Sequence, residues 1–517
     1  MKLKSPKETY DAIKKCIKPE WISAFLTAIC VGLLVHIPIF TSDIPNHDGL
    51  ASIYFDQNMI TSGRWFLTVA CGISSYYTLP WLIGVFSLLW LGFASVALTE
   101  ILEVRDKVGS GMLAAVLVSF PSLASTYAYM FTADGYMMAL FLAVFSVLLT
   151  KKYRFGFLAG GVCLAFSMGI YQAYLPFAML LCLYVIGMLF LQSGAWKEKC
   201  KKLFSYLGMG VIGVALYYVL LHVLLFLQGK QLADYQGING MAEQKGNLLD
   251  TILSMYRDFA AFSAKGNVLF NNVFSVLGLT ILGLAALFVF FRLVFQRGLW
   301  KRPMFYVTLF FILVAAPFAC NILLLISPEL NYHVLIRYQW VLFVIMVIAF
   351  WFHYGQKEAS AMMQWGVLLA GLVLIINYGI TDNIGYSNLE KRYEKTYAYC
   401  LRLVDRMEQT EGYYTGMPVA MIGVVGDENY PKTDVTGKVT DVLTGMNGDV
   451  LCYTGENYKN FLQHYLGVTI EIVDIEKVGE IYNTWEVYKE MDSFPGANSM
   501  KVVDGMLLIK TENKIEE

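Results

Sequence analysis

The chain has 517 residues, of which 57% are hydrophobic and only 15% are charged, and its formal net charge is -1 at pH 7. A chain this apolar is not expected to be a soluble globular protein, and a chain this long exceeds one ordinary domain. The near-zero net charge gives no reason to expect a nucleic-acid or an acidic partner. The composition therefore predicts a polytopic membrane protein.

Apolar runs close to the length of a membrane helix recur along the chain. The first, residues 21–40, follows a basic tail and precedes no small-residue cleavage site, so we expect a retained span rather than a removed signal peptide. Further runs lie at residues 80–99, 111–126, 135–150, 156–171, 173–192, 204–228, 268–294, 304–326, 337–353 and 365–380. The sequence thus predicts about eleven transmembrane helices.

Lysine and arginine are concentrated in alternate connections, which predicts the orientation of the spans. These connections are "EVRDKVG" (103–109), "KKYR" (151–154), "WKEKCKK" (196–202), "FQRGLWKRP" (295–303) and "HYGQK" (353–357). The positive-inside rule places them, together with the N-terminal tail, in the cytoplasm. The opposite connections, including residues 41–79, 127–134, 229–267 and 327–336, then face outward, and an odd number of spans carries the C-terminal segment outward as well.

The C-terminal segment differs in character from the rest of the chain. A helical pattern in "SNLEKRYEKTYAYCLRLVDRMEQ" is followed by β-rich runs such as "PVAMIGVVG" and "MKVVDGMLLIK", with helical stretches such as "ENYKNFLQHYL" between them. We expect a transmembrane domain over residues 1–380 and a small extracytoplasmic α/β domain over residues 381–517. Most of the nine cysteines lie in or beside apolar runs without metal-ligand spacing and are interpreted as small core residues, and a disulfide between Cys400 and Cys452 in the C-terminal segment is a less favoured alternative.

The stretch "TSDIPNHDGLASIYFDQNMITSGRW", residues 41–65, places acids directly after the first span. Asp48 precedes a segment with one apolar helical face, so it is either a helix N-cap or a general base held at the water interface. The two interpretations are compatible, because Asn46 or Asp43 could provide the cap.

Two arginines lie in connections where the predicted orientation makes basic residues sparse. Arg64, beside Trp65, is either an interfacial anchor or a guanidinium that binds a phosphate, whose oxygens its planar donors match. Arg337 lies at the membrane edge in "NYHVLIRYQW", where it either reaches outward or meets an anion such as a lipid-linked phosphate. His333 and Tyr338 of the same segment are further candidate binding residues.

A third acid, Asp134 in "MFTADGYMMAL", lies where an outward connection re-enters the bilayer. It is either the N-cap of the following helix or a functional acid, since a carboxylate at that depth is costly. The tight turn "SMGIYQAYLP" brings Tyr171 and Gln172 to the same surface, where such side chains suit sugar stacking and hydroxyl recognition. Anchoring in the aromatic belt is the alternative for the tyrosines.

The order of these motifs resembles the bacterial glucosyltransferase type II family, the serotype-converting O-antigen enzymes within the GT-C glycosyltransferases. The resemblance rests on the acid after the first span, "GRW", "GIYQAY" and a closing "SFPGANSMKVVDGMLLIK". It assigns the family's loop acid to Asp48, its arginine to Arg64 and its glutamine to Gln172. Relatives often have paired acids where this chain has His47-Asp48-Gly49, so Asp43 and Asp56 stay open as partners.

The resemblance implies a GT-C-like enzyme of the bacterial cytoplasmic (inner) membrane that uses no cofactor, and many members with monophosphate donors need no metal. Its expected donor is a polyprenyl-phosphate-linked glucose or similar sugar, and its acceptor a surface polysaccharide or glycolipid on the extracytoplasmic side. The residues fit this chemistry, because an acid can deprotonate an acceptor hydroxyl and arginines can stabilise a departing phosphate. A lipid-linked oligosaccharide transporter or flippase, a glycan polymerase, and a non-catalytic assembly protein remain alternatives.

Overall fold

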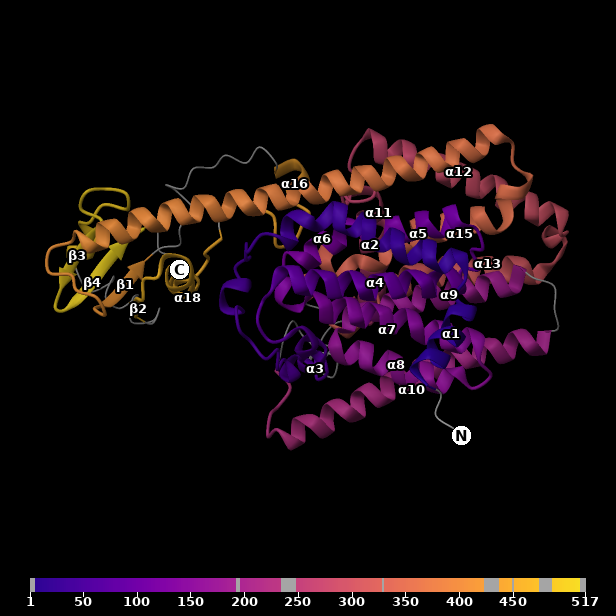
Figure 1. Ribbon diagram of the computed structural model, residues 1–517, viewed down its shortest axis with the longest axis horizontal. Coiled ribbons are helices and arrows are strands. Elements are labelled where there is room, and N and C mark those ends of the chain that lie inside the picture. The colour runs from indigo at the N-terminus through magenta and orange to yellow at the C-terminus, as the bar shows by residue number, and fades with distance from the viewer. Residues whose placement is uncertain are drawn as a thin grey trace. The chain divides into compact units, whose positions relative to one another are not determined.

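A computed structural model of the chain describes residues 5–191, 196–233, 248–327, 330–422, 437–448, 451–473 and 486–511. They belong to two compact units. The first consists of Met1–Ser42 and Asp56–Asn383, and the second of Asp43–Phe55 and Ile384–Glu517. Figure 1 shows the elements in their order along the chain.

The first unit is a bundle of apolar helices, several of which run side by side in Figure 1. Its helices are α1 (Pro6–Cys16), α2 (Pro19–Phe40), α3 (Leu67–Cys71), α4 (Pro80–Ile101), α5 (Lys107–Ser119), α6 (Pro121–Tyr127), α7 (Ala133–Lys152), α8 (Gly156–Ile170), α9 (Leu175–Leu191), α10 (Trp196–Leu227), α11 (Leu248–Lys265), α12 (Val273–Gln296), α13 (Pro303–Cys320), α14 (Leu323–Ile326), α15 (Val341–Phe350) and the first part of α16 (Ala361–Glu408). Short turns of helix connect them, and η2 (Ile60–Ser62), η3 (Gly72–Ser74), η5 (Gln172–Tyr174), η8 (Val334–Trp340) and η9 (Trp351–Gly355) contribute residues that are discussed below.

The polytopic membrane fold is confirmed. In the described part of the chain nine helices are long and apolar enough to cross a membrane, and ten if the bent pair α5 and α6 is counted as one span. The expected run at residues 156–171 is α8, which has only 15 residues. A straight helix of that length rises about 22 Å, and α8 leads from the Lys151 end of the bundle to Gln172 at the Gly63 turn, so it runs back along α7.

The bend between α5 and α6 has a local cause. Pro121 begins α6, and the preceding Phe120 has φ -75° and ψ 133°, the extended conformation that a following proline favours. The two helix segments therefore meet at 47°. Close helix packing elsewhere depends on small residues, as at Gly84 of α4, where a Cβ atom would lie 2.5 Å from the ring of Phe40 in α2.

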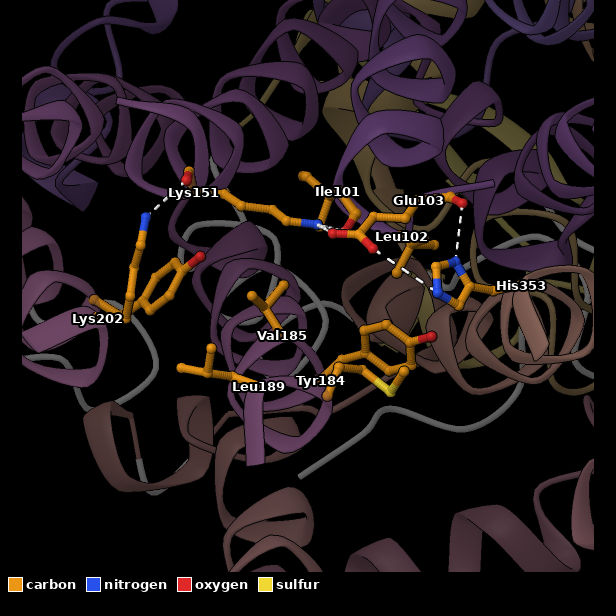
Figure 2. A pocket seen from close by; sticks show the side chains of 11 residues that line it. Ile101, Leu102, Glu103, Lys151, Tyr184, Val185, Leu189, Lys202 and His353 are labelled. Atoms are coloured by element: carbon orange, nitrogen blue, oxygen red, sulfur yellow. Dashed lines mark hydrogen bonds and ion pairs between the residues drawn. The ribbon is translucent and has the colours of Figure 1, made fainter. Parts of the chain in front are cut away.

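Charged side chains gather where the connections 103–109 and 151–154 meet. Lys151 at the end of α7 donates to Glu103 at 2.7 Å and to the Ile101 carbonyl at 2.6 Å, and His353 of η9 contacts the Glu103 carbonyl at 3.1 Å. These interactions are drawn in Figure 2. Three segments distant in sequence, Ile101–Glu103, Lys151 and His353, are thus joined by a polar network at one end of the bundle.

The second unit combines the end of α16 with a four-stranded sheet. The strands are β1 (Pro418–Ile422), β2 (Glu471–Ile472), β3 (Met500–Val503) and β4 (Met506–Lys510), in the order β2-β1-β4-β3. β1 pairs in parallel with β2 and β4, and β3 pairs antiparallel with β4. The hairpin turns at Asp504-Gly505, both at positive φ, as tight two-residue hairpins require. The short helices are α17 (Gly437–Thr440), α18 (Gly455–Phe461) and α20 (Glu486–Lys489).

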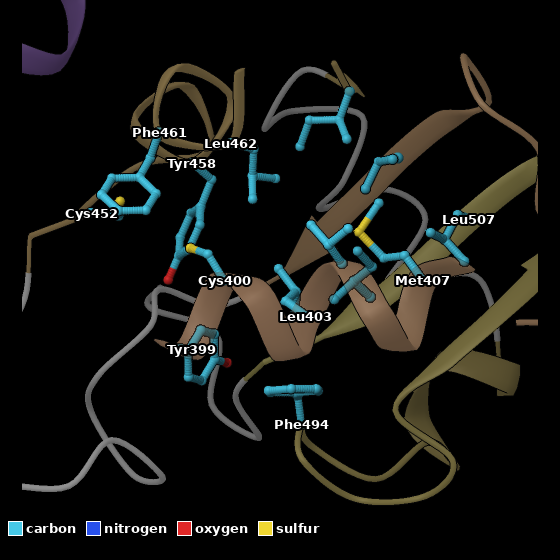
Figure 3. Close-up of a cluster of buried hydrophobic side chains, with 14 of the residues drawn as sticks. Tyr399, Cys400, Leu403, Met407, Cys452, Tyr458, Phe461, Leu462, Phe494 and Leu507 are labelled. Carbon is cyan, nitrogen blue, oxygen red and sulfur yellow. The ribbon is translucent and has the colours of Figure 1, made fainter. Parts of the chain in front are cut away.

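The larger hydrophobic core of the second unit is drawn in Figure 3, and a smaller cluster is formed by Ala420, Met491 and Leu508. Leu403 and Met407 of α16 pack with Tyr458 and Phe461 of α18 and with Leu507 of β4. The segment Asp43–Phe55 belongs to this unit because Leu50, which is fully buried, enters the same core. Cys400 and Cys452 also lie in it, and all nine cysteines of the chain are free thiols.

Candidate functional site

Arg64 is held by a tight reversal of the chain. The turn η2 ends at Gly63, whose φ of 80° is a left-handed conformation that glycine adopts without strain. The Arg64 N–H then donates to the Met59 carbonyl at 3.2 Å and closes the turn. The reversal fixes the direction in which the arginine side chain leaves the backbone.

Two side chains from distant helices support this turn. Gln172 of η5 donates to the Ser62 carbonyl at 3.2 Å and to the Tyr217 hydroxyl at 2.9 Å, and Tyr217 of α10 donates to the Gly63 carbonyl at 3.1 Å. A Cβ atom on Gly63 would lie only 2.5 Å from both the Gln172 amide nitrogen and the Tyr217 hydroxyl oxygen. Glycine is therefore required at this position for space as well as for conformation.

The Arg64 guanidinium lies against a pair of tyrosines. Its carbon is 4.8 Å from the centroid of the Tyr171 ring, and one terminal nitrogen donates to the Tyr136 hydroxyl at 3.3 Å. The two rings stack, with centroids 4.1 Å apart and planes only 3° from parallel. A cation above a ring face and a phenol in its plane together restrict the guanidinium. The structure thus brings together Arg64, Tyr171 and Gln172, which the sequence proposed separately, and adds Tyr136 and Tyr217.

Asp134 lies in the first turn of α7, two residues before Tyr136. Its side chain is 2% exposed, and one carboxylate oxygen accepts the N–H of Gly135 at 2.8 Å. A carboxylate at the start of a helix is stabilised by the free N–H groups and by the helix dipole. The position of Asp134 is accounted for by the beginning of α7, and a catalytic role remains compatible with it.

Arg337 already has an anionic partner within the protein. Its two terminal nitrogens donate to the two carboxylate oxygens of Asp258, each at 2.7 Å, and its Nε donates to the Tyr332 carbonyl at 2.8 Å. The guanidinium also lies 3.9 Å from the centroid of the Tyr332 ring and 4.3 Å from that of Phe262. Sequence reasoning expected an anion here but missed Asp258, which lies 79 residues away in α11.

The neighbours of Arg337 have different environments. The Tyr338 side chain is 1% exposed, and its hydroxyl donates to the Leu117 carbonyl at 2.6 Å, so it packs within the bundle. His333 lies just before η8, and its Nδ1 is buried without a hydrogen-bond partner among the described residues. Burial, with a smaller contribution from the Arg337 charge, lowers the pKa of His333 to about 4. The imidazole is therefore neutral near pH 7.

In the second unit, the candidate acid Asp48 is not used as a helix cap. The Asn46 side chain accepts the Gly49 N–H at 2.8 Å, whereas the Asp48 carboxylate makes no capping hydrogen bond to the turn Gly49–Ala51. The Asp48 side chain is 56% exposed, and its carboxylate lies 3.5 Å from Nε2 of His47. Of the two interpretations of Asp48, the structure thus assigns the cap to Asn46 and leaves this carboxylate accessible to solvent.

His47 and Asp43 complete this loop. The His47 ring packs edge-on against Tyr453, with centroids 5.1 Å apart, and its carbonyl accepts from Asn457 at 3.3 Å. Burial lowers the pKa of His47, Asp48 opposes that shift and Arg392 adds to it. Protein atoms around Asp43 exclude enough water to raise the pKa of its carboxyl. Sequence reasoning assigned no function to His47, although it directly precedes the candidate base.

Within the described ranges, no three histidine, cysteine or acidic side chains gather in a way that could hold a metal ion. The candidate residues of the first unit offer a restrained guanidinium, an amide and the buried carboxylate of Asp134, and those of the second unit offer the carboxylates of Asp43 and Asp48. These groups suit recognition of an anion and of hydroxyl-rich molecules.

Comparison with known protein families gives one match. Residues 37–354 match the profile of the family described as glucosyl transferase GtrII, which is more than half of the chain and contains all the candidate residues discussed above between Asp43 and Tyr338. Neither the curated proteins nor the solved structures that were compared contain a match. A profile match over more than half of the chain establishes the family, and it is the one that the order of the sequence motifs resembles. The chain belongs to the glucosyl transferase GtrII family.

Proposed function

We propose that this glucosyl transferase takes a glucosyl residue from a polyprenyl-phosphate-linked donor and transfers it to a cell-surface glycan on the extracytoplasmic side of the bacterial inner membrane. The observation that carries the proposal is the Arg64 guanidinium, held by the Gly63 turn against the stacked rings of Tyr136 and Tyr171. A donor that lies in the bilayer presents its phosphate at the membrane edge, where a guanidinium can bind it. The planar fork of arginine matches two phosphate oxygens.

The reaction needs a proton acceptor and a stabilised leaving group. An acceptor hydroxyl attacks the anomeric carbon, the bond from that carbon to the phosphate oxygen breaks, and the hydroxyl proton passes to a carboxylate. The electron pair of the broken bond stays on the polyprenyl phosphate, whose charge Arg64 stabilises. A neutral acceptor thus gives a neutral glycoside, and the lipid phosphate departs as an anion.

For the base we propose Asp48, with Asp134 and Asp43 as the alternatives. Asp48 has a largely exposed side chain and makes no capping bond, so an acceptor hydroxyl can approach its carboxylate. Asp134 is 2% exposed and accepts the Gly135 N–H, so proton transfer to it would first require opening of its surroundings.

The other candidate residues have supporting roles in the proposal. Tyr171 packs its ring between the Arg64 guanidinium and the Tyr136 ring, so we propose that it positions Arg64, as does Gln172, which supports the turn. The Arg337 guanidinium is already paired with Asp258, and a donor phosphate would have to share it. We therefore propose that Arg337 contributes less to donor binding than Arg64 does. We propose that His333 and Tyr338 help to hold the segment that carries Arg337 in place and do not contact the sugar.

Donor use is tested with membranes that contain the full chain. They are incubated with polyprenyl-phosphate glucose or with UDP-glucose, and the released lipid phosphate and the glucosylated product are measured. We expect transfer from the lipid donor alone, and Arg64→Lys should raise the donor KM at least ~10-fold because it keeps the charge but loses the fork. The matched control is Arg154→Lys, an exposed arginine at the other end of α7. Transfer from UDP-glucose, or an unchanged KM in Arg64→Lys, would contradict the proposal.

Orientation is tested separately with single cysteines in a background that lacks the native ones. Ala497→Cys, an exposed position in the second unit, should react with a membrane-impermeant thiol reagent on intact cells. Lys357→Cys, an exposed position in a connection that the positive-inside rule places in the cytoplasm, should react only after lysis. The reverse pattern would refute the orientation and the extracytoplasmic site.

A further inference from the structure

A pocket lies at the opposite end of the bundle from Arg64. It has a volume of about 190 Å³ and is lined by polar residues Glu103, Lys151, Lys202 and His353 and by Tyr184 and Tyr206, with apolar residues between them. Lys151 follows Tyr136 by fifteen residues in α7, so the pocket lies about 22 Å along that helix from the candidate site. A ligand bound here does not contact Arg64.

The polar end of the pocket has unused hydrogen-bond donors (Figure 2). Lys151 donates to the Ile101 carbonyl and to Glu103, and Lys202 donates to the Lys151 carbonyl at 2.9 Å. An ammonium group has three N–H donors, so these described contacts use two on Lys151 and one on Lys202. With Glu103 as the one carboxylate, this cluster of two lysines and one acid has a net positive charge at neutral pH.

Tyr184 provides a second and independent observation. Its hydroxyl is buried and has no hydrogen-bond partner among the residues that the structure describes. A buried phenol without a partner is costly, because it has lost its hydrogen bonds to water. Figure 2 shows this hydroxyl on the His353 side of the pocket and Lys202 on the opposite side, so different oxygen atoms of one ligand would accept from the hydroxyl and from the lysines.

The pocket continues into an apolar groove. A second hollow of about 150 Å³ shares Tyr184 and Met188 with the first and is otherwise lined by residues of α9, α12 and α13, among them Phe290, Phe305 and Leu309. At Gly187 a Cβ atom would come within 2.7 Å of Ile312, so α9 and α13 approach closely beside the groove. A cationic pocket that opens into an apolar groove between membrane helices has the shape and chemistry of a lipid site.

We propose that this pocket binds an anionic glycerophospholipid of the adjacent leaflet. Its phosphate would lie at the lysine side of the pocket, an ester oxygen of its glycerol would accept from the Tyr184 hydroxyl where the pocket meets the groove, and one acyl chain would follow the groove between α9 and α13. Basic pockets between membrane helices bind anionic head groups, and the net positive charge of the lysines and Glu103 favours an anionic over a zwitterionic lipid. The carrier lipid also has a phosphate, but the pocket lies at the wrong end of α7 for a donor that Arg64 holds.

The test is native mass spectrometry of the full chain purified in detergent and stripped of lipid. The probes are palmitoyl-oleoyl phosphatidylglycerol, phosphatidylcholine with the same chains, and undecaprenyl monophosphate. We expect phosphatidylglycerol to bind at least fivefold more tightly than the other two, and Lys202→Gln, Tyr184→Phe and Leu309→Trp each to weaken it at least fivefold. The matched control is Lys201→Gln, the exposed neighbour outside the pocket, which should bind as the wild type does.

Thermal melting of each variant without lipid shows whether it is folded. Unchanged binding of phosphatidylglycerol by a folded Lys202→Gln and a folded Tyr184→Phe would overturn the site. Equal binding of phosphatidylcholine would overturn the choice of an anionic lipid, and preferred binding of undecaprenyl monophosphate would overturn the choice of a glycerophospholipid. None of these outcomes depends on the donor used for glucosyl transfer.

Discussion

Substitution of Gly63 by alanine tests how the structure positions Arg64. An alanine at a φ of 80° costs about 1–2 kcal/mol in backbone strain. Its Cβ atom would lie 2.5 Å from the Gln172 amide nitrogen and the Tyr217 hydroxyl oxygen, so both groups must move by roughly 1 Å to reach ordinary van der Waals contact. That movement breaks the hydrogen bonds to the Ser62 and Gly63 carbonyls, each worth about 1 kcal/mol. The expected total is about 3–4 kcal/mol.

The matched control is Gly229→Ala in the same unit. Gly229 also has a positive φ, 61°, but a Cβ atom there meets nothing within 4 Å, so only the backbone strain of about 1–2 kcal/mol applies. We expect Gly63→Ala to melt at a lower temperature than Gly229→Ala and, in membranes, to raise the donor KM at least tenfold, since Arg64 is the next residue. Equal melting temperatures and equal donor KM values in the two variants would refute the positioning role of the turn.

Three further predictions concern the other candidate residues. Asp258→Asn should cost about 3 kcal/mol of stability, measured by thermal melting, because it leaves the guanidinium of Arg337, whose side chain is 6% exposed, without its anion; an unchanged melting temperature would refute this. Because the pKa of His333 is lowered to about 4, the unfolded chain binds a proton between pH 6.5 and 4 that the folded chain does not, so stability falls as the pH falls through this window. Between pH 7 and 4 the free energy of unfolding of the wild type should fall by about 3 kcal/mol more than that of His333→Gln. An equal fall in both proteins, measured by thermal melting at each pH, would contradict the lowered pKa. Asn46→Ala should cost about 1 kcal/mol while Asp48→Asn costs almost nothing, and the reverse ranking would return the capping role to Asp48.

Local patterns in the sequence predicted the membrane helices because apolar length is encoded in consecutive residues. They also predicted a helix at "ENYKNFLQHYL", which the structure forms as α18 and the turn Leu462–Leu466. The run at 156–171 was predicted in the same way, and the structure forms it as α8, a 15-residue apolar helix. Whether the number of crossings is odd, and hence which side the second unit faces, depends on that helix.

Contacts between distant segments could not be predicted in this way. Nothing local indicates that Leu50 packs in the core of the second unit or that Asp258 pairs with Arg337. For the second pair a weak signal existed, since an acid and an arginine on two connections expected on the same side can meet. The Tyr136–Tyr171 stack had no comparable signal, because aromatic residues at membrane edges are usually anchors.

The most direct test of the catalytic proposal is the rate of glucosyl transfer by Asp48→Asn in membranes with polyprenyl-phosphate glucose, measured beside Asp43→Asn and Asp134→Asn at matched expression. Asparagine keeps the size of the side chain but cannot take a proton at neutral pH. If Asp48 is the base, its variant should lose about 100-fold or more in rate while the donor KM and the melting temperature stay near those of the wild type, and the other two variants should lose much less. Near-normal transfer by Asp48→Asn would contradict the assignment, and a 100-fold loss in Asp134→Asn or Asp43→Asn instead would give the role to that acid.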